Sequence, residues 1–311
     1  NVDNLQIPYW AMNLEEHCEA FIPDNEETRA VAINVLAKCL VAARAKSTIA
    51  SNMRNLTADS PVPYLLGDLL EELDSETGKL EKQADFQTFT RLKINIIQKF
   101  SDRRFRFIFD AEYLHHSLED FVKEIIRIPS QGHPISIIDM SGTPSEMMGV
   151  IVSMISRLVF DYAVWTPSDI RSPVLLICEE AQRYLPAERL EFAASAERQL
   201  ERIAREGRKY GVALCLISQR PAELSPTALS QCGTIVAFRL SNSLDQTQVR
   251  AALPEASGGM VDAIASLQSR ECIICGEGTR VPVRVRIDEL ERHSRPASED
   301  PVFSVLWNTE R

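Results

Sequence analysis

The sequence predicts an α/β protein in which a mostly parallel sheet flanked by helices follows a helical region. Two observations support this fold class. The first part of the chain places apolar residues at helical spacing, and from residue 134 short apolar runs alternate with helical segments. Continuous apolar strands separated by helices are typical of a sheet buried on both faces. We therefore divide the chain into a helical region (1–130), an α/β core (131–292) and a C-terminal arm (293–311).

The helical region contains several amphipathic segments. Asp24, with Glu27 three positions later, has the capping-box pattern of a helix start, and apolar residues then recur at helical spacing from Ala30 to Leu40. Residues 48–60 are polar and rich in Ser, Thr and Asn, which indicates a loop. Further helices are predicted over 63–73, 85–100 and 117–127.

The core alternates strands and helices in chain order. Apolar runs predict strands at 135–139, 174–178, 212–217, 234–238, 271–275 and 281–287. Helices are predicted at 144–162, 187–209, 244–253 and 259–267. The arm ends in an apolar segment, Phe303–Trp307, which we expect to need a partner surface.

Composition excludes some classes of protein. The 311 residues are 45% hydrophobic and carry 34 Lys and Arg against 44 Asp and Glu, a net charge of -10. A protein that coats nucleic acid through a uniformly basic surface is therefore excluded, whereas a local basic surface is not.

No apolar stretch reaches the roughly 20 residues that span a bilayer, so we expect no membrane partner. The chain starts at Asn1 without a signal-like segment, and we expect the natural N-terminus to lie elsewhere.

The cysteines indicate a reducing compartment. Their number is odd, seven, and several sit in apolar runs, which favours buried free thiols in the cytoplasm. Cys272 and Cys275 have the spacing of a metal or redox pair. They lie in a strand-like run without a second pair at zinc spacing, and we interpret them as strand residues.

A strand that ends in two acids is the first candidate for chemistry. The run Val174–Cys178 is followed by Glu179 and Glu180, which is the Walker B arrangement of ATPases. There one carboxylate lies near the Mg²⁺ of the nucleotide, usually through water, and the next polarises the attacking water. Strand-end acids that merely cap a helix are the alternative.

The end of the following strand carries a polar amide. Gln219 can sense a γ-phosphate or orient water, whereas the alternative is a plain turn that Pro221 terminates.

A row of arginines marks the helix between these two strands. Arg198, Arg202, Arg205 and Arg208 follow at spacings of four, three and three, which places them along one helix face. Interleaved glutamates favour a solvated, salt-bridged face. However, Gly207–Gly211 closes the helix just before a strand, and an arginine there can reach a neighbouring subunit's phosphate as an arginine finger.

The chain lacks a phosphate-cradling loop. A P-loop needs G-x-x-x-x-G-K-[ST]. The Gly78-Lys79 pair fails this pattern, because Leu73 stands at the first glycine position and Leu80 at the Ser/Thr position.

Together these segments resemble the HerA family, hexameric ATPases of the HerA/FtsK group of RecA-like motors. The segments are IPYWAMNLEE (7–16), ISIIDMSG (135–142), LLICEEAQRYLP (175–186) and the run 205–240 that contains GVALCLISQRP. The resemblance implies a RecA-like P-loop ATPase core with a helical insertion on its N-terminal side. It also implies that the Walker A region lies upstream of Asn1, so that this fragment alone is expected to be inactive.

The resemblance also implies residue roles, with ATP and Mg²⁺ as cofactors. Glu179 binds Mg²⁺ through a water molecule, Glu180 activates the attacking water, and Gln219 senses the γ-phosphate. Arg205 is the first arginine-finger candidate and Arg208 the second. Glu179 stands where Asp is common and is longer by one methylene group, which bears on metal affinity.

The function implied by the resemblance is a ring-shaped translocase or helicase, a hexamer that moves double-stranded DNA through its pore. Such rings work with a nuclease in DNA repair or with antiphage-defence effectors, including sirtuin-like enzymes. Two alternatives stay open. One is a ring-forming scaffold that recruits an effector with little motor work, and the other is a conjugation-type secretion ATPase.

Overall fold

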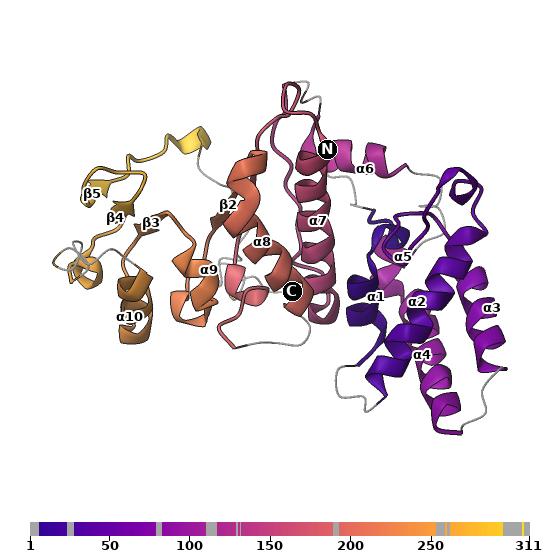
Figure 1. Ribbon diagram of the computed structural model, residues 1–311. Coiled ribbons are helices and arrows are strands. Elements are labelled where there is room, and N and C mark those ends of the chain that lie inside the picture. Colours follow the sequence, from indigo (N-terminus) through magenta and orange to yellow (C-terminus); the bar gives the residue numbers. More distant parts are fainter. Residues whose placement is uncertain are drawn as a thin grey trace. The chain divides into compact units, whose positions relative to one another are not determined.

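The computed structural model divides into two compact units, Asn1–Cys232 and Gly233–Arg311, each described here by itself (Figure 1). It describes residues 6–23, 28–78, 83–109, 117–128, 130, 132–188, 193–252, 259, 262–294 and 307. The first unit holds the helical region and a parallel pair of strands. The second holds a small antiparallel sheet.

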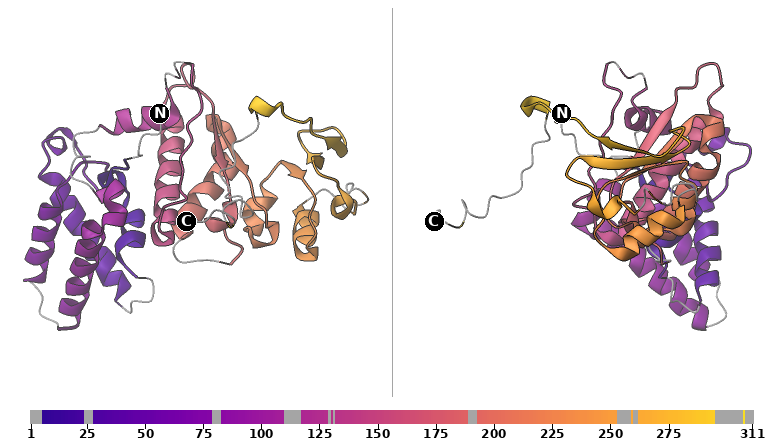
Figure 2. Two further views of the ribbon diagram at one scale, coloured as in Figure 1. Left: turned by 180° about the vertical axis from the view of Figure 1, so that it is seen from behind. Right: turned by 90° about the vertical axis from the view of Figure 1, so that its left-hand side faces the viewer.

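The helical region is built from short and medium-length helices. Their bounds are α1 (Leu14–Phe21), α2 (Arg29–Ala45), α3 (Leu66–Thr77), α4 (Gln83–Ser101), α5 (Arg106–Phe109) and α6 (Leu118–Ile126). Helices α2, α3 and α4 pack side by side, as the front and back views show (Figures 1 and 2). The helices predicted over 63–73, 85–100 and 117–127 are therefore confirmed, with ends shifted by a few residues.

A capping box begins α1. The Asn13 side chain accepts a hydrogen bond from the Glu16 amide (2.8 Å), and the Glu16 carboxylate accepts one from the Asn13 amide (2.9 Å). These two bonds satisfy amides that the helix start leaves without partners. The capping box predicted at Asp24 and Glu27 lies outside the described residues.

Helix α7 (Ser145–Trp165) begins after Pro144 and forms the centre of the first unit. It confirms the helix predicted at 144–162 and ends three residues later. By length and composition it is the one helix among the described residues that could cross a membrane, but 78% of that stretch is buried inside the fold. Such burial is typical of a core helix.

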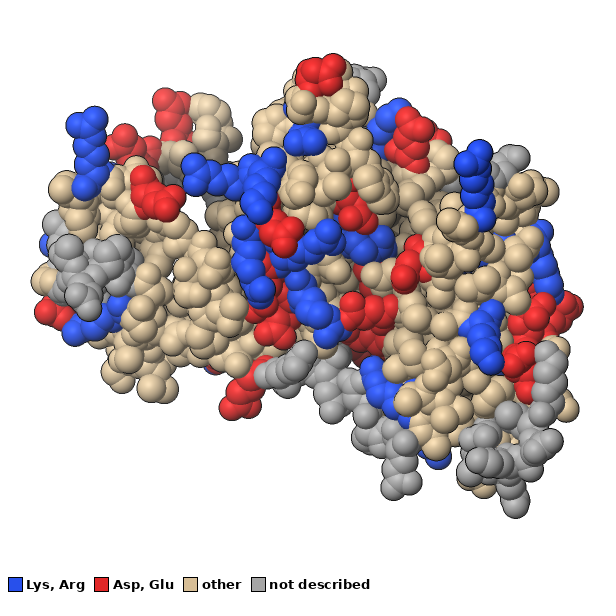
Figure 3. Space-filling model, viewed as in Figure 1, with Lys and Arg blue, Asp and Glu red and all other residues tan. Residues whose placement is uncertain are grey.

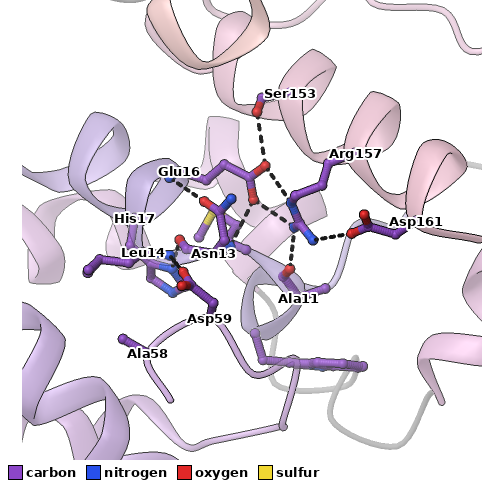
Figure 4. A network of polar contacts seen from close by, with 12 residues as sticks. Ala11, Asn13, Leu14, Glu16, His17, Ala58, Asp59, Ser153, Arg157 and Asp161 are labelled. Carbon is purple, nitrogen blue, oxygen red and sulfur yellow. Dashed lines mark hydrogen bonds and ion pairs between the residues drawn. The ribbon is translucent and has the colours of Figure 1, made fainter. Parts of the chain in front are cut away.

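A buried ion pair joins α1 to α7 (Figure 4). Glu16 is fully buried, and its carboxylate accepts hydrogen bonds from the Arg157 guanidinium (2.8 and 3.0 Å) and the Ser153 hydroxyl (2.9 Å). Arg157 also donates to the Ala11 carbonyl (2.7 Å) and lies 3.8 Å from Asp161. Because a buried charge is costly without partners, this network fixes α1 against α7.

His17 is a second buried polar group on α1. Its Nδ1 donates to the Asn13 carbonyl oxygen (2.7 Å), and its Nε2 accepts from the Tyr64 hydroxyl (2.8 Å). Burial, reinforced by the positive charge of Arg44, lowers the pKa of His17 to about 3. The folded protein therefore holds this imidazole neutral.

We expect acid to destabilise the protein through His17. Its folded pKa lies below the unfolded value of about 6.5, so the unfolded chain binds a proton that the folded chain excludes. Stability is then lost as the pH falls below about 6.5, at a slope approaching 1.4 kcal/mol per unit. Urea unfolding at pH 7 and pH 5 should show a smaller loss for His17→Gln than for the parent. Equal losses in both proteins would refute this assignment.

The parallel pair consists of β1 (Val174–Cys178) and β2 (Val212–Leu216), with Val174 opposite Val212 and Cys178 opposite Leu216. Between them runs α8 (Ala194–Tyr210), and α9 (Pro226–Ser230) follows β2. One face of the pair packs on the core that α7 and α8 help to form. On the other face, Leu175 and Ile177 are 58% and 54% exposed.

One prediction for this part of the core is wrong, and another is confirmed with a later start. Residues 135–139 pair with no strand in the described part of the chain, and Ile135 and Ile137 are 73% and 90% exposed. Apolar side chains favour a strand, but a strand also needs a neighbour for its backbone hydrogen bonds. The helix predicted over 187–209 is present as α8, but it begins at Ala194, and Pro186 and Ala187 instead bond to the segment after β2.

The second unit contains β3 (Thr234–Ala237), α10 (Ser243–Ala252), β4 (Glu271–Gly276) and β5 (Val283–Arg286). The strand order is β3-β4-β5, with both pairings antiparallel. Six residues link β4 to β5, too few for the crossover that parallel neighbours require. This sheet therefore differs from the mostly parallel arrangement expected.

The remaining predictions for the second unit have mixed outcomes. Cys272 and Cys275 are buried in β4, where burial raises the pKa of both thiols, so they are strand residues as predicted. The helix predicted over 259–267 lies partly outside the described residues and otherwise contains the short 3-10 turn Ile264–Ser266. The apolar segment 303–307 also lies outside them, except for Trp307.

Candidate active site

The carboxyl ends of β1 and β2 lie side by side and place their following loops together. The Ile217 amide donates to the Cys178 carbonyl oxygen (2.9 Å), and the Ala181 amide donates to the Ile217 carbonyl oxygen (3.0 Å). These bonds extend the contact beyond the ladder. The polar residues after each strand therefore belong to one site, as expected for parallel strands.

Glu180 is at the centre of this site. Its backbone has the left-handed conformation, with φ 48° and ψ 44°, and its side chain is half-buried. The Gln219 amide nitrogen donates to one carboxylate oxygen (2.7 Å), and the Gln182 amide nitrogen donates to the other (2.6 Å). The structure thus brings together Glu180 and Gln219, two of the residues predicted from the strand ends.

Two further members of the site were not predicted. The Ser218 hydroxyl donates to the Gln182 amide oxygen (2.6 Å) and accepts from the Arg220 amide (3.0 Å). Gln182 and Ser218 lie within two residues of predicted site residues in the sequence. That proximity was the available signal, but it does not reveal that the two side chains meet.

Glu179 is exposed at the end of β1. Its backbone carbonyl accepts a hydrogen bond from the Tyr184 hydroxyl (2.5 Å), and burial raises the pKa of Tyr184, which keeps that hydroxyl protonated. In the described part of the chain, no group of three or more His, Cys, Asp or Glu side chains is placed to hold a metal. Mg²⁺ in nucleotide sites often uses one or two carboxylates together with substrate phosphates, so Glu179 fits that donor set.

Of the Gly78-Lys79 pair, which fails the P-loop pattern in the sequence, the structure describes Gly78. Gly78 ends α3 in a right-handed helical conformation, and its amide donates to the Asp74 carbonyl oxygen (3.0 Å). This amide is therefore used within the helix end.

The arginines of α8 form contacts within the chain. Arg198 pairs with Glu15, and the Arg202 guanidinium lies 4.4 Å from the centre of the Phe160 ring. The face of the protein over α8 shows basic side chains intermingled with acidic ones (Figure 3). This arrangement agrees with the salt-bridged surface weighed from the sequence.

The two arginine-finger candidates lie toward the end of α8. Arg205 is 55% exposed and donates to Glu201 (2.5 Å), and Arg208 is exposed in the last turn. Whereas Glu180 contacts Gln219 directly, Arg205 contacts a residue of its own helix. Both guanidiniums are accessible to another molecule.

Comparison with known proteins identifies relatives over most of the chain. A family model described as "Helicase HerA, central domain" matches residues 1–159. A probable helicase of Methanocaldococcus jannaschii is 36% identical over 188 residues, which are 58% of this chain and 36% of that protein. The DNA double-strand break repair helicase HerA of Saccharolobus solfataricus is 23% identical over 282 residues, 88% of this chain and 53% of the relative. The chain thus spans about a third to a half of the length of these relatives.

Solved structures confirm the fold class. VirB4 of Thermoanaerobacter pseudethanolicus aligns with 92% of this chain and 74% of its own, with a TM-score of 0.58 and 12% identity. At that identity the likeness shows the fold alone. That fold is the α/β core of P-loop ATPases predicted from the sequence.

Proposed function

Because the chain belongs to the HerA helicase family through its central domain, we propose that it is the part of an ATP-driven DNA motor that activates the attacking water. The observation that supports this proposal most directly is the Glu180–Gln219 contact (2.7 Å) at the joined ends of two parallel strands. A carboxylate and an amide in that position suit the roles of activating water and sensing the γ-phosphate.

The proposed chemistry is hydrolysis of the terminal phosphate of ATP. A Glu180 carboxylate oxygen accepts a proton from water while the water oxygen bonds to the γ-phosphorus. The bond from that phosphorus to the bridging oxygen breaks, and ADP and phosphate leave. Gln219 donates its amide hydrogen to a γ-phosphate oxygen in place of Glu180. When bound, Mg²⁺ neutralises phosphate charge, and Glu179 would hold it through water.

The assembly we propose is a ring of identical subunits, a hexamer, around double-stranded DNA. Arg205, or Arg208 in its place, would reach the nucleotide of the neighbouring subunit and stabilise transition-state charge. The exposure of both side chains supports this role. A nuclease or sirtuin-like effector would work with this ring in the cytoplasm, in DNA repair or antiphage defence.

An ATPase assay of the complete open reading frame tests the proposal. We expect ATP turnover that linear duplex DNA stimulates, and no turnover from the 311-residue chain alone, because the phosphate cradle is absent from this sequence. The matched control is the same preparation with single-stranded DNA of equal length. Binding of an effector without any turnover would favour the scaffold instead, and turnover that duplex DNA leaves unchanged would favour a secretion ATPase.

A further inference from the structure

The two amides that hold Glu180 differ in their surroundings. Each donates to one carboxylate oxygen at nearly the same distance, 2.6 Å from Gln182 and 2.7 Å from Gln219. Gln219, however, is exposed, whereas Gln182 is half-buried and receives a second hydrogen bond from Ser218. Gln219 is therefore the donor that can leave the carboxylate at little cost.

Ser218 determines which way the Gln182 amide faces. A side-chain amide has a donor end and an acceptor end. The Ser218 hydroxyl accepts from the Arg220 amide (3.0 Å) and directs its own proton to the Gln182 oxygen (2.6 Å). The amino group of Gln182 is thereby turned toward Glu180. The reversed amide would place its oxygen against the carboxylate, and the two acceptors would repel each other.

Gln182 also connects the two strands on which the site is built. It belongs to the short 3-10 turn Ala181–Arg183 after β1, and Ser218 follows β2. The Ala181 amide, which neighbours Gln182, bonds the Ile217 carbonyl oxygen (3.0 Å). One main-chain bond and one side-chain bond thus connect the segment after β1 to the segment after β2. The Gln182 amide is therefore fixed relative to both strand ends.

We infer that Gln182, oriented by Ser218, is the positioning residue that keeps Glu180 aimed at the attacking water after Gln219 has moved to the nucleotide. This inference rests on the proposed ATPase function and assigns different roles to the two glutamines. Gln219 changes partner during the cycle, and Gln182 does not.

The test uses the complete open reading frame and the substitutions Gln182→Met, Ser218→Ala and their combination. Methionine matches the length of glutamine without its hydrogen bonds. We expect Gln182→Met to lower kcat roughly 10- to 100-fold, as misplacement of a catalytic group does. KM and the affinity for a fluorescent non-hydrolysable ATP analogue should stay within about twofold, because the residue does not bind substrate. Gln231→Met, an exposed position, is the matched control.

The Ser218 variants test whether Ser218 acts through Gln182. We expect Ser218→Ala to lower kcat by a smaller factor and to have no further effect in the Gln182→Met background. Ser218→Thr, which retains a hydroxyl, should recover most of the lost rate. If Gln182→Met unfolds, the contrast between alanine and threonine at position 218 decides the question.

Each contrary result has a distinct meaning. Parental kcat in Gln182→Met, while Glu180→Gln is inactive, would overturn the inference and leave the proposed function standing. Full additivity of the two substitutions would overturn the role of Ser218. Absence of ATP hydrolysis in the unsubstituted protein would refute the proposed function itself, and the inference would fall with it.

Discussion

Replacing Glu180 by Gln in the complete open reading frame is expected to lower the rate of ATP hydrolysis roughly 100- to 10,000-fold, the contribution of a positioned general base. Glutamine keeps the shape of the side chain but cannot accept the proton of the attacking water. Nucleotide binding and subunit assembly should persist, since neither requires that proton transfer. Phosphate release at saturating ATP measures the first effect, and analogue binding with sedimentation measures the others.

Glu188→Gln is the matched control, because Glu188 is an exposed glutamate further along the same loop. Parental turnover in Glu180→Gln would contradict the assignment of Glu180 as the general base.

Mixing Glu180→Gln subunits with Arg205→Ala subunits, each inactive alone, tests whether the arginine finger acts between subunits. If Arg205 acts on the neighbour's nucleotide, mixed rings contain interfaces with both residues intact and regain activity. Mixtures that stay inactive at every ratio would argue against Arg205 acting between subunits.

Replacing Arg157 by Met is expected to lower the free energy of unfolding by about 3–5 kcal/mol, the usual cost of breaking a buried ion pair from one side. The substitution leaves the fully buried Glu16 carboxylate without its guanidinium partner. It also removes the donor to the Ala11 carbonyl. Urea unfolding followed by circular dichroism measures the change.

Lys123→Met is the matched control for that experiment. Lys123 pairs with Glu119 one helical turn away (2.6 Å) and is exposed, and such surface pairs contribute about 0.3–0.5 kcal/mol. Adding Glu16→Gln to Arg157→Met should restore part of the lost stability, because the unpaired charge disappears. Equal effects of the Arg157 and Lys123 substitutions would show that the buried pair does not stabilise the fold.

Local periodicity was enough to predict most elements. The apolar run 174–178 coincides with β1. The family resemblance implied that Glu180 and Gln219, which follow β1 and β2, act on one nucleotide. Both features depend on near neighbours in the chain and on the geometry of parallel strands. The structure places Glu180 against Gln219, and their catalytic roles stay predictions.

Features that depend on distant partners were not predicted. Arg157 and Glu16 are separated by 141 positions, and neither stands out in its own segment. Residues 135–139 have the side chains of a strand, but their neighbours in space decide whether a ladder forms. Gln182 and Ser218 are likewise ordinary polar residues until two loops bring them together.

The left-handed backbone at Glu180 has a consequence for the design of variants. A residue with a side chain costs about 1–2 kcal/mol in this conformation, and glycine escapes the penalty. A redesign that optimises stability alone would therefore choose glycine at position 180 and would delete the carboxylate. The most stable sequence and the working sequence are expected to differ there, so thermostabilised variants of this protein should keep position 180 unchanged.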